Sequence, residues 1–441
     1  MSSAPRRAEC PQPSDPPPTP PSRGWATLSS LQARNFRMFA SGQIVSNTGI
    51  WVQRIAQDWL VLSITHSATA VGVTTALQFM PTLLFGLTGG LIADRYPKRR
   101  VLLATQVGMS SMAAALALLT LTHQEAAWHV YAIAFGLGTV TAVDNPVRQS
   151  FVNEMVGPDQ LRNAISINSS VFQLAALIGP AISGALISAV GAGYAFAVNA
   201  ASYVAPLTAL LLMRDDELIR SPRGDTMSRQ VSAGLRYVAG RPQLLWPIVL
   251  VGVFGMFTSN LPVTLAVYAK TVFQSGPGGY GLLNSVVALG SLGGALVSTR
   301  RTRARLRELV GTCLILATLE MLAAAAPDRW SYCLFLVAVG AATLLLYTSA
   351  NSMVQLAADD SIRGRVMGVY LVVFIGGGAL GGPLLGSIDQ HFGPRIGMLL
   401  AGAVPAVATV LVALKLAHDG RLRVRLRRRG PLSHLVAIVH R

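Results

Sequence analysis

The stretch Gly89-Gly90-Leu91-Ile92-Ala93-Asp94-Arg95-Tyr96-Pro97-Lys98-Arg99-Arg100 decides how the rest of the chain is interpreted. One apolar run ends at this stretch and a second starts at Val101. One acidic and four basic residues within seven positions predict a short turn between two buried helices. If both helices cross a bilayer, the turn lies on the cytoplasmic side, because Lys and Arg next to spans stay there. Gly90 and Asp94 share one helical face, so we expect Gly90 to let a neighbouring helix approach closely.

The composition is that of a membrane protein. Of 441 residues, 52% are hydrophobic and 12% are charged, whereas a soluble domain carries about 25% charged residues. The net charge is +17, but the basic residues occur in short clusters between apolar runs. This distribution favours contact with anionic membrane lipid over a nucleic-acid groove. Three cysteines and scattered histidines give no disulfide framework and no metal site, so we expect no metal and no cofactor.

The apolar runs predict twelve transmembrane helices of about 20 residues or more each. Their approximate ranges are 38–63, 70–93, 101–122, 128–147, 164–189 and 194–213, then 243–268, 279–299, 308–326, 330–357, 366–388 and 395–416. The expected fold class is therefore an all-α membrane protein.

The predicted domains are two six-helix bundles at 34–213 and 243–417, joined by a cytoplasmic connecting loop at 214–242 that includes a surface helix. Residues 1–33 are expected to form a disordered cytoplasmic tail because they are rich in Pro and Ser. Residues 418–441 form a basic cytoplasmic tail, which either lies on anionic lipid as an amphipathic element or only fixes the topology.

The distribution of basic residues supports this topology. Of the 36 Lys and Arg residues, only Lys270, Arg329 and Arg395 fall on loops of the opposite side, and Arg54 falls within a span. Because basic residues flanking spans stay in the cytoplasm, we expect a multi-pass protein of the cytoplasmic (inner) membrane with both termini inside.

The two bundles repeat one another at an offset of about 200 residues, as in transporters built from parallel repeats. The segment 65–72 before the second span is echoed by 274–281 before the eighth, and each span ends in a small residue followed by a charged turn. Gly179-Pro180 in the fifth span is echoed by Gly382-Pro383 in the eleventh. Two echoes in register indicate two related halves.

The turn resembles the loop between helices 2 and 3 of the major facilitator superfamily, Gly-x-x-x-Asp-Arg-x-Gly-Arg/Lys-Arg/Lys. The matching residues are Gly90, Asp94, Arg95, Lys98 and Arg99, and Pro97 stands where the family has Gly. The segments 57–62, 144–154 and 363–368 are similar to its enterobactin-exporter-like and macrolide-efflux-like branch, a group of drug:proton antiporters. The resemblance implies the major facilitator fold.

The resemblance also implies a cytoplasmic gating cluster, formed by Asp94, Arg95, Arg99, Asp144 and Arg148, that latches helices 2, 4 and 11 in one state. The alternative is a set of surface ion pairs that only holds the topology.

Glycine and proline in the fifth and eleventh spans predict a sliding seam between the halves. Pro frees a backbone carbonyl, and Gly permits close helix approach. The seam residues are Gly179, Pro180, Gly184, Gly378, Gly382, Pro383 and Gly386; Ala175 stands at the first Gly position of the exporter motif.

Arg54 and Asp58 are four residues apart in the first span and can pair on one helical face. Ionisable groups at membrane depth usually face a bundle interior or a water-filled cavity. Asp58 is therefore either a protonatable coupling residue or a structural partner of Arg54. The helix-4 Arg of many proton antiporters is absent, since Ala132 precedes Gly136 at that spacing. Proton coupling is thus implied by the resemblance alone.

The expected function is secondary export of a drug-like compound or siderophore by alternating access, in exchange for protons. Small-molecule substrate, protons and membrane lipid are the expected partners of a monomer that binds no nucleic acid. The alternative is an importer or symporter of a small nutrient, against which the absence of an unpaired buried cation argues. No catalytic constellation and no Walker loop stands out, so we do not expect an enzyme. Candidate cavity residues are Gln43, Asn47, Gln78, Asn168, Gln173, Asn260, Asn284 and Asn351.

Overall fold

A computed structural model describes residues 29–219, 231–299, 305–359, 362–418, 423–425 and 437–439. Most of the predicted disordered tail, the centre of the connecting loop and most of the basic tail lie outside the described residues. Within these regions a short 3-10 helix forms at Ser29–Gln32, and two short strands pair antiparallel, β1 (Arg423–Arg425) with β2 (Ala437–Val439).

Nearly all other described residues are helical. The first part of the chain holds α2 (Arg34–Thr65), α3 (Ala68–Arg95), α4 (Lys98–Leu121), α5 (Ala127–Val190), α6 (Ala192–Ser202), α7 (Val204–Leu212) and the 3-10 turn η2 (Asp215–Glu217). The second part holds α8 (Val231–Ala239), α9 (Pro242–Phe257), η3 (Thr258–Asn260), α10 (Leu261–Val267), the π-turn η4 (Tyr268–Val272), α11 (Gly276–Thr299), α12 (Leu306–Ala324), α13 (Arg329–Ala357), α14 (Arg363–Phe392) and α15 (Pro394–His418).

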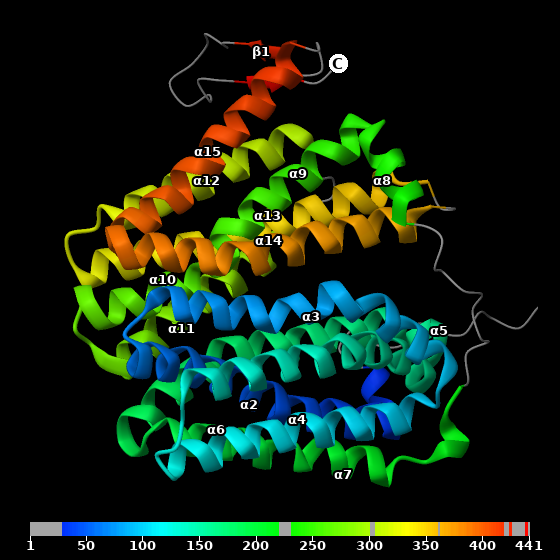
Figure 1. Ribbon diagram of the computed structural model, residues 1–441. Helices are drawn as coiled ribbons and strands as arrows, with labels where there is room; N and C mark the ends of the chain where they lie inside the picture. Colours follow the sequence, from blue (N-terminus) through cyan, green and yellow to red (C-terminus); the bar gives the residue numbers. More distant parts are fainter. Residues whose placement is uncertain are drawn as a thin grey trace, which may run out of the picture.

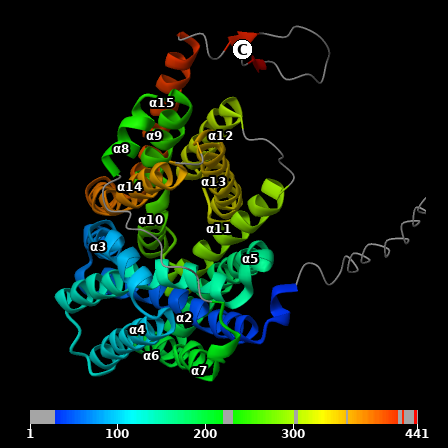
Figure 2. The ribbon, with the colours of Figure 1, turned by 90° about the vertical axis from the view of Figure 1, so that its right-hand side faces the viewer.

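Helices α2–α7 pack into one half and α9–α15 pack into another. Figure 1 shows the first half below the second. We call them the N-terminal half and the C-terminal half. They meet mainly where α3 packs against α14 and where α5 packs against α11, and both crossings are visible in Figure 2. In the repeat, α3 corresponds to α11, and the second part of α5 corresponds to α14. In space, however, α3 packs against α14 and α5 packs against α11.

Helix α5 combines the predicted spans 128–147 and 164–189 and continues through the connection between them. Its single break is at Gly157, whose φ of 71° and ψ of 175° lie outside the helical region. Phe151 and Met155 recur at a helical spacing in this connection and are buried against Phe36 and Phe39 of α2. This apolar stripe keeps the segment helical where the spans alone predict a loop.

Proline interrupts the predicted span at 243–268. Pro262 has no N–H to offer the carbonyl four residues earlier, and the chain forms the 3-10 turn η3 at that point. The span thus consists of α9, η3, α10 and η4 in sequence.

Among the described residues, nine helices are long and apolar enough to cross a membrane when α5 is counted once. The helix α2 is not among them because polar residues lower its hydropathy, and α12 is not because it carries three charged residues, Arg307, Glu308 and Glu320. The count of twelve spans stays a prediction.

Helix α8 lies in the connection between the halves and docks on the chain that precedes α14. The Tyr237 hydroxyl donates a hydrogen bond of 2.7 Å to Asp359, and Arg241 pairs with the same carboxylate at 3.2 Å. A surface helix in this loop was expected from the sequence, but its partner was not.

Candidate functional site

The two halves are pressed together at one end of the molecule. A Cβ atom added to Gly382 of α14 would come within 2.6 Å of the Gly72 carbonyl oxygen of α3. At the other crossing, a Cβ on Gly184 of α5 would lie 2.9 Å from the Pro277 carbonyl oxygen of α11. Backbones approach this closely only where side chains are missing. We call this end, which also holds His66 and Lys270, the closed end.

Hydrogen bonds between the halves are also confined to the closed end in the part of the chain that the structure describes. The Tyr280 hydroxyl of α11 donates to Asp58 of α2 over 2.9 Å. Lys270 donates to the Leu62 carbonyl at 2.8 Å and lies 3.1 Å from His66 Nδ1. The Ala68 N–H at the start of α3 donates to the side chain of Gln390 of α14 over 2.7 Å. We call these contacts the closed-end bonds.

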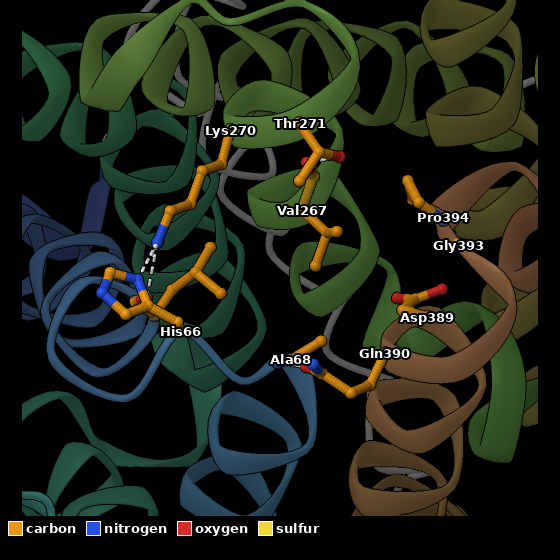
Figure 3. A pocket seen from close by; sticks show the side chains of 10 residues that line it. His66, Ala68, Val267, Lys270, Thr271, Asp389, Gln390, Gly393 and Pro394 are labelled. Atoms are coloured by element: carbon orange, nitrogen blue, oxygen red, sulfur yellow. Dashed lines mark hydrogen bonds between the residues drawn. The ribbon is translucent and has the colours of Figure 1, made fainter.

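A pocket of about 330 Å³ lies between the halves at this end. Figure 3 shows Lys270 reaching towards His66 on one side, with Asp389 on the far side. Asp389 accepts a hydrogen bond of 2.8 Å from Thr264 of α10. The pocket thus places a cation and a carboxylate, both of the C-terminal half, next to His66 of the N-terminal half without joining them in an ion pair.

The opposite end, which holds Asp94 and Asp359, is less tightly packed at several glycines of the described residues. A Cβ added to Gly86 of α3, Gly293 of α11 or Gly368 of α14 would meet nothing within 4 Å. A cluster of buried apolar side chains at this end contains residues of the N-terminal half only, among them Phe36 and Phe151, and no side chain of the C-terminal half. We call it the open end.

The charged residues of the predicted gating cluster do not come together in this structure. Asp144 pairs with Arg148 at 2.5 Å, and both are largely buried. Arg99 pairs with Asp215 at 2.6 Å and ties α4 to the end of α7. Asp94 and Arg95 are exposed and make no ion pair with any described residue. The gating cluster that the resemblance implies is therefore not assembled in this state, in which the halves are closed at the opposite end.

The buried Asp144–Arg148 pair is held by polar side chains of the same half. Asp144 accepts hydrogen bonds from Thr105 at 2.7 Å and from Gln106 at 3.0 Å, both on α4. Arg148 donates to Gln43 of α2. Gln43 is thus a buried partner of Arg148 and is turned away from a substrate. Lys98, the remaining cation of the motif, pairs with Glu154 of α5 at 2.5 Å.

The expectation for Gly90 is wrong in this structure. A Cβ on Gly90 would meet nothing within 4 Å, whereas one on Gly89 would collide with the Ala142 carbonyl of α5. One residue turns the helix by about 100°. The rotation of α3 about its axis, which the sequence did not fix, puts Gly89 on the packed face.

Arg54 and Asp58 are not an ion pair in this structure. Asp58 is 3% exposed and its hydrogen bond comes from Tyr280. The Arg54 guanidinium instead lies 5.5 Å from the ring centres of both Trp51 and Phe79. The two side chains therefore make no direct ion pair, although the Arg54 charge still acts on Asp58, and Asp58 contacts the other half of the molecule through Tyr280.

The predicted cavity residues divide into two groups. Gln43, Asn260 and Asn284 are buried, and the two asparagines donate to backbone carbonyls of their own turns. The remainder are partly exposed, namely Asn47, Gln78, Asn168, Gln173 and Asn351. Only the second group is available to a bound molecule in this state.

Most of the predicted seam residues lie between the halves. Gly382, Pro383 and Gly386 of α14 face α3, and a Cβ added to Gly378 would lie 3.9 Å from the Phe79 ring. Pro180 and Gly184 of α5 face α11. Gly179 differs, because it packs on Trp51 of α2 within its own half.

Sequence reasoning missed Tyr280, His66 and Gln390 as bonding residues, and it placed Lys270 only in a loop. The repeat carried one signal for Tyr280. The pair Tyr280-Gly281 aligns with Val71-Gly72, and both glycines lie at crossings between the halves. A hydroxyl next to a crossing glycine is well placed to reach the other half.

Comparison with known protein families identifies the family of this chain. The profile of the family described as transmembrane secretion effector matches residues 25–427. The chain belongs to this family. It is a multi-pass membrane transporter of the major facilitator superfamily and is not an enzyme.

Two characterised relatives are named for siderophores. The staphyloferrin A transporter of Staphylococcus aureus is 26% identical over 266 residues, which cover 59% of this chain and 66% of that protein. The enterobactin exporter EntS of Escherichia coli O81 is 23% identical over 397 residues, covering 88% of this chain and 93% of that exporter.

Solved structures share the fold. A bacterial homolog to the human lysosomal transporter Spinster, in an inward-facing and unoccupied conformation, matches with a TM-score of 0.69 and 17% identity. It covers 90% of this chain and 99% of that one. A POT family transporter in complex with a thioalcohol-conjugated peptide has a TM-score of 0.72 and 16% identity, covering 89% and 99%. The expected fold class is thus confirmed.

Proposed function

We propose that this transporter exports an amphiphilic small molecule, of the siderophore or drug-like class, across the inner membrane in exchange for protons. The observation that carries the proposal is the seam, which is tightly packed and hydrogen-bonded at the closed end, whereas glycines of α3, α11 and α14 at the open end face no neighbouring atom within 4 Å of an added Cβ. Two halves that touch at one end only can exchange the end that is closed, which is alternating access.

The orientation follows from the basic residues. Lys98, Arg99 and Arg148 belong to the open end, whereas Lys270 belongs to the closed end. Since basic residues accumulate on the cytoplasmic side, the open end faces the cytoplasm and both termini lie there. A cytoplasm-facing state is the one that loads a compound for export.

Asp58 is the leading candidate for coupling to protons. Its carboxylate is buried in a predicted span and bonded to the opposite half by Tyr280. When the closed end separates, this bond breaks and Asp58 gains access to water. A carboxylate whose environment changes with the state of the transporter can bind a proton in one state and release it in the other.

The substrate class rests on the relatives and on the composition of the inner surfaces. Both named relatives handle siderophores by their descriptions. Amide side chains such as Asn47, Asn168 and Gln173 are partly exposed on α2 and α5. Amides and aromatic rings suit amphiphilic compounds better than sugars or phosphates.

The test is accumulation of amphiphilic dyes and iron-free siderophores in energised cells that express the chain, with and without a protonophore. We expect lower accumulation than in empty cells, and loss of this difference when the protonophore is added. Asp58→Asn should abolish the difference, whereas Asp216→Asn, which changes an exposed aspartate without an ion pair to a described residue, should not. Both variants must reach the membrane in equal amounts.

Higher accumulation in the expressing cells would contradict export and favour import. Export that persists in Asp58→Asn at the wild-type rate would contradict the coupling role while leaving export in place.

A further inference from the structure

Arg54 is a cation that forms no direct ion pair with a described residue, although its charge acts on the nearby Asp58. No described carboxylate lies within ion-pair distance of its guanidinium, and no hydrogen bond from it to a described residue forms. The nearest acid along the helix, Asp58, is bonded to Tyr280. A charged side chain at membrane depth is costly unless it faces a polar partner or water. Because the Asp58 carboxylate is engaged by Tyr280, the N–H groups of Arg54 are left to hydrogen-bond a partner from outside the chain.

The position of Arg54 points to the space between the halves. Ile44, Asn47, Trp51, Arg54 and Asp58 follow each other at a helical spacing of three or four and share one face of α2. Exposure falls along this face, from 53% at Ile44 through partly exposed side chains to 3% at Asp58. Arg54 thus lies one helical turn before the closed-end bond of Asp58, at the inner end of a face whose exposure falls towards the closed end.

Aromatic rings surround the guanidinium. Trp51 and Phe79 each hold it at 5.5 Å from the ring centre. Phe172 of α5 packs edge-on against Trp51 at 5.7 Å and is 48% exposed. Phe79 in turn approaches Gly378 of the C-terminal half. Aromatic side chains from α2, α3 and α5 therefore meet next to α14. A compound held between the halves at this place would contact both halves.

We propose that Arg54, with Trp51, Phe79 and Phe172, binds the anionic group of the transported compound, and that this compound is a planar aromatic anion. That the bound compound is also transported rests on the proposed function, whereas its binding at Arg54 does not. A guanidinium offers several N–H donors in one plane, which match the two oxygens of a carboxylate. The exposed ring of Phe172 offers a surface on which an aromatic group stacks.

From the sequence, the absence of a buried cation that would bind an anionic nutrient counts against import. Arg54 is a partly exposed cation held next to aromatic rings, so an anionic substrate is favoured for either direction of transport.

The experiment compares two probes that share a ring system and differ in charge. Binding of 2-naphthoate and of the uncharged 2-naphthamide to the purified full-length transporter in lipid nanodiscs is measured by calorimetry. We expect wild type to bind 2-naphthoate at least tenfold more tightly than 2-naphthamide. Arg54→Gln should remove this preference while binding 2-naphthamide as wild type does. Arg54→Lys, which keeps the charge but not the planar donors, should retain part of it.

Equal binding of the two probes by wild type would overturn the proposal, as would an unchanged preference in Arg54→Gln or no binding of 2-naphthoate at all. Thermal unfolding of each variant controls for folding. Because the readout is equilibrium binding, it can succeed where the accumulation assay fails, and the reverse. The failure of the inference and the failure of the proposed function are thus separable.

Discussion

Replacing Tyr280 by Phe removes one hydroxyl group and with it the hydrogen bond to Asp58 across the halves. Because the bond joins different halves, it exists only while the closed end is closed. Such a bond contributes about 1 kcal/mol to a neutral carboxyl and up to about 3 kcal/mol to a charged one. At about 1.4 kcal/mol per tenfold change, Tyr280→Phe should shift the equilibrium towards opening of the closed end by about 5-fold to about 150-fold.

The shift can be measured with two spin labels, one on each half at the closed end. Gln124 and Phe392 are exposed there and belong to different halves. Distances between the labels in nanodiscs, measured by pulsed electron resonance in a background without the three cysteines, report the fraction of each state. We expect a longer distance to gain population in Tyr280→Phe. Asp58→Asn should lengthen the distance less, because an amide oxygen can still accept the bond.

The chain offers a matched control. Tyr268 is 2% exposed and belongs to the same end, but its hydroxyl makes no hydrogen bond to a described residue. Tyr268→Phe therefore removes a buried hydroxyl without removing a bond between the halves, and should leave the distances unchanged. If Tyr280→Phe and Tyr268→Phe give the same distribution as wild type, the bond does not hold the closed end, and the reasoning is refuted.

Three further predictions concern other parts of the fold. Gly72→Ala should disfavour the closed end by about 1–3 kcal/mol, since a methyl group would collide with the α14 backbone; Gly86→Ala on the same helix meets open space and should leave the label distances as in wild type. Asp144→Asn should lower the free energy of unfolding by about 3–5 kcal/mol because it leaves a buried guanidinium without its charge partner, whereas the exposed Asp94→Asn should change it by no more than about 0.5 kcal/mol; equal thermal shifts in the two variants would contradict this. The hydrogen bond from the Tyr237 hydroxyl, with Arg241, holds the pKa of Asp359 below its ordinary value of 3.8, so the docking of α8 should be complete above that pH and weaken as the pH falls through the lowered pKa. Protection of the α8 amides against hydrogen exchange, corrected for the intrinsic exchange rate at each pH, should fall in acid and, in Asp359→Asn, already at neutral pH; protection that is independent of both changes would argue against this docking contact.

The sequence was a good guide to the seam because its glycines obey a local rule. Gly382-Pro383 and Pro180 with Gly184 can be recognised along a single helix, and a repeat at a constant offset links the two places. In parallel repeats, equivalent helices occupy equivalent positions, so matching small residues mark matching crossings. Gly179 shows the limit of this argument, because its neighbour in space is Trp51 of its own half.

The candidate site was harder to predict because its partners are distant in the sequence. Asp58 and Tyr280 are 222 positions apart, and Lys270 lies 204 positions from His66. Spacing within a helix suggested the Arg54–Asp58 pair, and the structure separates the two. An (i, i+4) spacing makes a contact possible, but side chains from other helices decide whether it forms.

By itself, the sequence determined that this chain is a helical membrane protein in two related halves. The reason is that a bilayer leaves backbone groups no partners but each other, so long apolar runs must be helices, and basic residues predict their direction. Only the tertiary structure decided which end of the seam is closed, that Gly89 and not Gly90 is packed, and that Arg54 forms no direct ion pair with Asp58. Those properties depend on the rotation and tilt of each helix against its neighbours, which are set by contacts between side chains far apart in the chain.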